Sequence, residues 1–100
     1  MGAHDFHASV YGETADEAYK EAVDEALYEY GHDPYNGTIS TTHGFVLIPL
    51  NGGESVYDWA SRVVDDERVQ KRGNCACVAD PDEPIEDGVS LWHFAGWAAS

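Results

Sequence analysis

Residues 14–31 read TADEAYKEAVDEALYEYG, and this stretch is the best-marked structural element of the 100-residue chain. Thr14 with Glu17 three residues later forms a capping box, which satisfies backbone N–H groups at the start of a helix. Small and apolar side chains then recur at helical spacing as far as Gly31, a residue type common just after a helix end. The stretch therefore predicts an amphipathic helix that packs one face on a core.

The segments around this helix predict strands and a second helix. The expected strands are residues 6–11, 38–42, 45–48, 75–79 and 91–98, and the second helix begins at Ser55 and ends before Gly73. His43-Gly44 separates two of the strands and predicts a hairpin. The expected fold is a single α+β domain over residues 1–100, ordered β-α-β-β-α-β plus a C-terminal strand. Its antiparallel sheet carries both helices on one face, as in the ferredoxin-like, split βαβ plan.

The charge is the outlying feature of the composition. Nineteen Asp and Glu residues against five Lys and Arg give a net charge of −14. This balance argues against direct binding to nucleic acid or to an anionic membrane, because phosphate neutralisation needs clustered cations. Three interpretations stay open: a solvated surface, adaptation to a salt-rich cytoplasm, or attraction of a basic protein partner.

Targeting signals are missing from the printed residues. No apolar run approaches the roughly 18 residues that a membrane-spanning helix needs, and the first residues lack the pattern of a signal peptide. The expected location is the cytoplasm.

The outer face of the first helix carries a ladder of like charges. Its members follow one another at four-residue spacing: Glu17, Glu21, Glu25 and Glu29. Each like-charge neighbour at this spacing costs about 0.2–0.5 kcal/mol, so a helix selected for stability alone would alternate Glu with Lys. The ladder predicts a polyanionic surface for a basic partner, with Asp65 and Asp66 of the second helix as further contacts. The alternative is a solvated face in a chain that is acidic throughout.

Two other segments carry candidate binding residues. The loop from His32 to Thr38 concentrates polar and aromatic side chains that could hold a small molecule: His32, Asp33, Tyr35 and Asn36. The alternative is a plain turn formed by its Pro, Asn and Gly residues. The last strand carries Trp92 and Phe94 on one face and Trp97 on the other, so a face left uncovered would suit self-association into an oligomer.

Motifs for catalysis or metal binding are absent from the sequence pattern. Cys75 and Cys77 point to one side of a strand, and a zinc site would need two more ligands, for which His43 and His93 are candidates. Buried free thiols are favoured over zinc. The chain has no phosphate loop or nucleophile elbow, so the expectation is a protein without cofactor, metal or enzymatic activity.

The stretch from Gly12 to Ile48 resembles small bacteriophage proteins, particularly those of phages that infect actinobacteria. The similarity lies in the Gly-x-Thr-Ala-x-Glu-Ala-Tyr helix start and in the run from Tyr30 to Ile39. The resemblance implies an accessory or anti-defence role in the host cytoplasm, since small acidic phage proteins often occupy the nucleic-acid groove of a host protein. The predicted function is thus a small acidic binding protein that inhibits a basic, nucleic-acid-binding partner. The alternatives are an assembly oligomer and a small-molecule binder.

Overall fold

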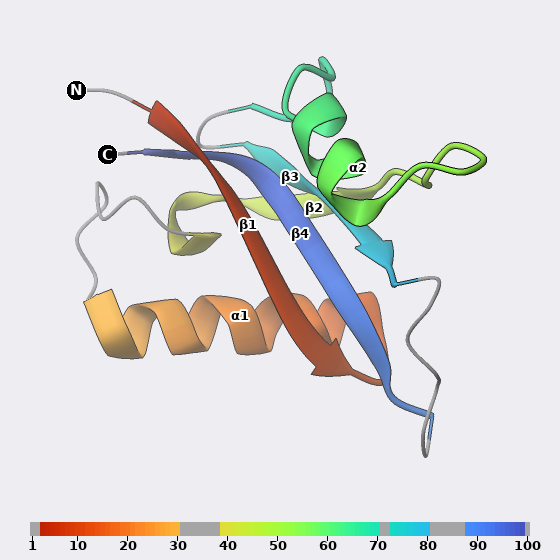
Figure 1. The fold of residues 1–100 in the computed structure, drawn as a ribbon. Helices are drawn as coiled ribbons and strands as arrows, with labels where there is room; N and C mark the ends of the chain where they lie inside the picture. Colours follow the sequence, from red (N-terminus) through yellow and green to blue (C-terminus); the bar gives the residue numbers. More distant parts are fainter. Residues whose placement is uncertain (1–2, 31–38, 71–72, 81–87, 100) are drawn as a thin grey trace.

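The computed structural model describes residues 3–30, 39–70, 73–80 and 88–99. In chain order, their elements are β1 (Ala3–Gly12), α1 (Ala15–Tyr30), the 3₁₀ helix η1 (Ile39–Thr41), β2 (Gly44–Leu47), α2 (Val56–Val63), β3 (Asn74–Ala79) and β4 (Ser90–Ala99) (Figure 1). The predicted α+β class is confirmed. Neither helix in these ranges is long and apolar enough to cross a membrane.

The strands form one sheet in the order β1-β4-β3-β2. β4 lies between β1 and β3 and is antiparallel to both, so the first and last segments of the chain run side by side (Figure 1). Ser9 stands directly opposite His93 in this pairing. β2 pairs parallel with β3, and α2 forms the crossover between them. β1 is consequently an edge strand of the described sheet.

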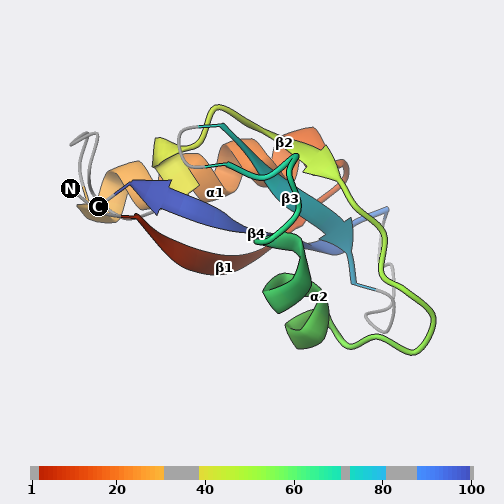
Figure 2. The ribbon, with the colours of Figure 1, turned by 90° about the horizontal axis from the view of Figure 1, so that it is seen from above.

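The two helices cover opposite faces of the sheet, as the view from above shows (Figure 2). One buried cluster joins α1 and η1 to the sheet and contains Ala18, Ala22, Ala26, Ile39, Cys75, Cys77 and Phe94. The other joins α2 to the sheet and contains Ile48, Trp59, Val63, Val69, Ala76 and Ala95. The central strands therefore bury side chains on both faces, which explains why β3 is apolar at every position after Asn74.

Several details of the predicted topology are wrong. The helices do not share one face, and the sheet is mixed rather than antiparallel, because β2 and β3 run in the same direction. Residues 38–42 form no strand in their described part. The Thr42 backbone N–H and hydroxyl both donate to the Ile39 carbonyl, at 3.0 and 2.7 Å, which closes a 3₁₀ turn. Such local bonds compete with strand pairing, so the expected hairpin with residues 45–48 does not form.

The second helix is shorter than predicted. Its start agrees, since the Ser55 hydroxyl accepts from the Asp58 backbone N–H at 3.1 Å. The helix ends at Val63, and turns follow it over residues 64–68, where the sequence predicted further helix. The Asp66 carboxylate accepts from the backbone N–H of Arg68 and binds its guanidinium at 2.8–2.9 Å. This side-chain bond to the local backbone favours a turn over another helical turn.

Gly96 is a tight packing position in the middle of β4. A Cβ at this residue would lie 2.9 Å from the Cys75 Cβ and 3.3 Å from Val69 Cγ1. Gly96→Ala is therefore expected to lower the free energy of unfolding by about 1–3 kcal/mol, through overpacking. Gly52→Ala is the matched control, since a Cβ at Gly52 meets nothing within 4 Å. Urea unfolding measures both variants, and equal stabilities would contradict this packing.

Candidate functional site

The side of α1 that borders β1 carries a row of carboxylates. Ala18, Ala22 and Ala26 are buried against the sheet, and the residue before each of them is a ladder glutamate, so the ladder lies about 100° around the helix from the buried alanines. All four ladder residues are exposed: Glu17, Glu21, Glu25 and Glu29. The capping box forms largely as predicted, with the Thr14 hydroxyl accepting from the Glu17 N–H at 3.1 Å and Glu17 Oε2 accepting from the Glu13 N–H at 3.3 Å.

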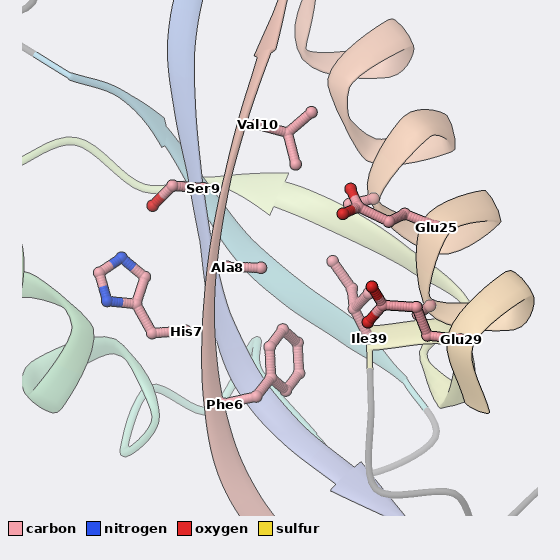
Figure 3. Close-up of a pocket in the computed structure, with 10 residues that line it drawn as sticks. Phe6, His7, Ala8, Ser9, Val10, Glu25, Glu29 and Ile39 are labelled. Atoms are coloured by element: carbon pink, nitrogen blue, oxygen red, sulfur yellow. The ribbon is translucent and has the colours of Figure 1, made fainter.

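The ladder runs beside a groove between α1 and β1. A hollow of about 320 Å³ lies at its end near the C-terminus of α1, and Phe6, Ala8 and Val10 point into it from β1 (Figure 3). Ala22, Ala26 and Ile39 complete its apolar lining. Glu25 and Glu29 extend beside these side chains from α1, so an apolar floor meets an acidic rim (Figure 3).

A second hollow of about 500 Å³ lies at the other end of the same groove. Its lining comes from the end of β1 and the first half of α1: Tyr11, Gly12, Glu17, Lys20, Glu21 and Asp24. The two hollows together include all four ladder glutamates and the β1 residues from 6 to 12. We call this combined surface the α1–β1 groove.

The carboxylates of the groove are not neutralised by neighbouring cations. Among the described residues no ion pair involves α1, although Lys20 lines the groove. Arg62 instead binds Glu54 at 2.9 Å and Arg68 binds Asp66 at 2.8 Å, both on the α2 side. The Arg68 guanidinium holds the pKa of Asp66 well below its usual range. Negative charge in the groove is therefore balanced by solvent ions, or by a partner.

Asp65 and Asp66 do not join the ladder. They follow α2, where the Val64 carbonyl accepts from the Trp97 indole at 2.7 Å, so this segment lies over the face of the sheet opposite α1. Asp65 is exposed, and Asp66 is engaged with Arg68. The structure thus separates these two residues from the four glutamates with which they were grouped.

The aromatic residues of the last strand belong to the interior. β4 is a central strand, not an exposed edge, and Phe94 is buried in the α1 cluster. Trp92 and Trp97 are half-buried and donate their indole N–H groups to the carbonyls of Gly12 and Val64. The structure does not bring these three side chains together on one open face. The loop residues His32, Asp33, Tyr35 and Asn36 lie outside the described residues.

The two cysteines are buried free thiols in the α1 cluster. Burial raises the pKa of each thiol to about 12. Cys77 adds a smaller increase to the pKa of Cys75, and Asp16 adds one to the pKa of Cys77. His93 points to the other face of the sheet, so it cannot complete a zinc site with them. Within the described ranges no group of three or more His, Cys, Asp and Glu side chains is arranged to hold a metal ion.

A polar network on the α2 face was not predicted. His93 is only 7% exposed, and its Nε2 lies 2.7 Å from Asp80 Oδ2. Its Nδ1 lies 2.8 Å from Ser9 Oγ and 3.1 Å from His7 Nε2. Alternation does place His7, Ser9 and His93 on one side of their strands. The sequence gives no sign that β1 pairs with β4, and only this pairing brings His93 into contact with residues more than 80 positions away.

His7 makes the stability of this network depend on pH. Burial, and then the neighbouring His93, lower the pKa of His7 below its ordinary 6.5. Below about pH 6.5 the unfolded chain binds this proton more readily than the folded chain, so the free energy of unfolding falls as the pH drops through the folded-state pKa. His7→Phe, which keeps a ring beside Tyr57, is expected to remove this part of the decline. Urea unfolding at pH 7.5, 6 and 5 tests it; parallel curves for wild type and variant would contradict the assignment.

The four glutamates predicted from their spacing thus lie along one groove, and the network around His93 lies on the opposite face. Comparison with protein-family models, curated proteins and solved structures finds no match to this chain.

Proposed function

We propose that this chain is a binding protein that captures an extended basic segment of a partner protein in the α1–β1 groove. The observation that carries the proposal is the coincidence of three features in one place. They are an apolar floor, a rim of exposed glutamates without ion pairs among the described residues, and the outer edge of β1. An edge strand offers unpaired backbone groups to which an extended segment can add as a further strand.

The dimensions of the ladder match an extended partner. Successive ladder glutamates are four residues apart, which is a rise of about 6 Å along the helix. Alternate residues of a strand are about 6.6–6.8 Å apart and point to the same side. A segment with Lys or Arg at every second position, laid along β1, could therefore set one cation near each glutamate. The residues of the partner segment between these cations point to the opposite side and do not contact the glutamates.

Charge also favours a basic partner over other classes. The net charge of −14 raises the local concentration of cationic segments and speeds their association, while it repels nucleic acid and anionic lipid. In the finer form of the proposal the partner is a nucleic-acid-binding protein of a host cell, and the glutamate ladder occupies the surface that phosphates would otherwise contact. This form corresponds to an anti-defence or accessory inhibitor.

The experiment uses a fluorescent peptide of alternating lysine and valine, ten residues long, and measures its affinity by anisotropy. The double variant Glu25→Gln/Glu29→Gln is expected to bind about 3- to 10-fold more weakly, which corresponds to about 0.3–0.7 kcal/mol for each exposed ion pair with the peptide. Asp65→Asn/Glu67→Gln is the matched control, because it removes the same charge from the α2 side.

A second control separates spacing from charge alone. A block peptide of five lysines followed by five valines has the same composition and charge, but it cannot place a cation at every second position. It is expected to bind more weakly than the alternating peptide. Equal losses in the two double variants, or equal affinity of the two peptides, would contradict a specific groove.

A further inference from the structure

The His93 network has the connectivity of a serine nucleophile with its base and orienting carboxylate. Ser9 Oγ lies 2.8 Å from His93 Nδ1, and His93 Nε2 lies 2.7 Å from Asp80 Oδ2. Arrangements of this kind are recognised by geometry and roles, not by position in the sequence. We propose that Ser9 is an acylatable nucleophile activated by His93, with small activated esters as its substrate class. Ser9 and His7 also line the hollow beside Glu25 and Glu29, but their side chains point to the other side of β1, so the proposed site adjoins the α1–β1 groove (Figure 3).

The hydrogen-bond partners assign the protons of His93. Asp80 accepts at Nε2, so the neutral imidazole carries its proton on that nitrogen and leaves a lone pair on Nδ1. The lone pair faces the Ser9 hydroxyl. The base nitrogen is thus Nδ1 and the oriented nitrogen is Nε2, the reverse of the arrangement in chymotrypsin-type proteases. Asp80 is a positioning residue, because it acts through His93.

The exposure of Ser9 and of His93 suits these roles. Ser9 is exposed on the edge strand, where an ester can approach its Oγ. His93 is 7% exposed and lies on the central strand β4, held between Ser9 and Asp80. A base that is oriented by a third group and lies within hydrogen-bond reach of an accessible hydroxyl is an arrangement that activates a nucleophile.

The reaction transfers one acyl group at a time. Ser9 Oγ attacks the ester carbonyl carbon and forms the new C–O bond while His93 Nδ1 takes the hydroxyl proton. The bond from carbon to the leaving oxygen breaks, and His93 returns the proton to that oxygen, so an alcohol or phenol leaves. Water then attacks the acyl carbon and gives a proton to His93. Ser9 recovers that proton, and a carboxylic acid is released.

His7 limits the reactivity of Ser9. Its Nε2 lies 3.1 Å from His93 Nδ1, close to the position of the Ser9 hydroxyl. A protonated Nε2 on His7 donates to the same lone pair and competes with Ser9 for it. His7→Phe is therefore expected to keep or raise the reactivity of Ser9.

The test is covalent labelling of the full chain with a fluorophosphonate, located by peptide mass spectrometry. The label is expected on Ser9 in the wild type, in His7→Phe and in the control Ser61→Ala, which removes an exposed serine of α2. Ser9→Ala should stay unlabelled at that peptide. His93→Gln should label about 100-fold more slowly, the lower end of the effect of a general base. p-Nitrophenyl acetate should give the same ranking of variants.

A spectroscopic measurement on the wild type covers the case in which His93→Gln fails to fold. The ¹⁵N shifts of the His93 ring should show an unprotonated Nδ1 and a protonated Nε2 near neutral pH, and Asp80→Asn should alter this tautomer. No Ser9 label on folded wild-type protein, an unchanged rate in folded His93→Gln, or loss of labelling in His7→Phe would overturn the proposal. A proton on Nδ1 of the wild-type ring would do the same.

Discussion

Replacing Trp59 with alanine is expected to lower the free energy of unfolding by about 3–5 kcal/mol, a large share of the 5–15 kcal/mol typical of a domain. Trp59 is fully buried and attaches α2 to the sheet in the cluster that contains Ile48, Ala76 and Ala95. Its indole N–H also donates to the Ile48 carbonyl at 2.8 Å. The truncation leaves both a cavity and a buried acceptor without its donor.

The control for Trp59 lies on the same helix. Tyr57 is 78% exposed, so Tyr57→Ala is expected to change the stability by no more than about 0.5 kcal/mol, although it removes a ring contact with His7. Thermal and urea unfolding of the two variants measure the difference. Similar losses in both would mean that α2 is not packed on the sheet as described, and that the second core cluster is misplaced.

The quadruple variant Glu17→Gln, Glu21→Gln, Glu25→Gln and Glu29→Gln is expected to bind the alternating lysine–valine peptide about 10- to 100-fold more weakly than the wild type. All four carboxylates line the groove and have no ion pair among the described residues. Glutamine keeps their size and removes their charge. The variant also relieves like-charge repulsion along α1, so it should fold at least as stably as the wild type.

Salt separates this electrostatic effect from a packing effect. The wild-type affinity is expected to fall steeply between 50 and 500 mM NaCl, because the screening length shrinks from more than 10 Å toward 3 Å. The quadruple variant, which stays strongly negative, should show a shallower dependence over the same range. A wild-type affinity that does not change with salt would show that the ladder is only a solvated face.

The elements that the sequence predicted well are those defined by local signals. α1 begins at its capping box, α2 begins after Ser55, and the last strand follows the apolar run near residues 91–98. Each signal depends on residues within one or two turns of each other. The strand predicted near residue 40 was wrong, also because of a local interaction. The Thr42 hydroxyl bonds to the nearby Ile39 carbonyl, which favours a turn over pairing with a strand.

One strand carries a signal for the placement of the helices that the predicted plan did not use. Residues 75–79 carry apolar side chains at every position, and this run already indicates a strand buried on both faces. That pattern favours helices on opposite faces and a parallel crossover over the antiparallel plan that we expected. The strand order then follows from long-range packing, which periodicity does not reveal.

For the candidate sites, too, local features could be predicted from the sequence and long-range contacts could not. The glutamate ladder could be predicted, since four-residue spacing fixes a helix face. The groove beside it could not, because it requires β1 to lie at the sheet edge next to α1. The contact of Ser9 with His93 also requires the β1–β4 register. Asp80 comes from the end of a third strand, so no short motif joins these residues.

The most direct test of the account is an NMR titration of the ¹⁵N-labelled chain with the alternating lysine–valine peptide. We expect the largest amide shift changes in residues 6–12 of β1 and in α1, with slower hydrogen exchange along the outer edge of β1. The quadruple glutamine variant should lose this pattern. Shift changes centred on α2, or spread evenly over the surface, would contradict the assignment of the α1–β1 groove as the binding site.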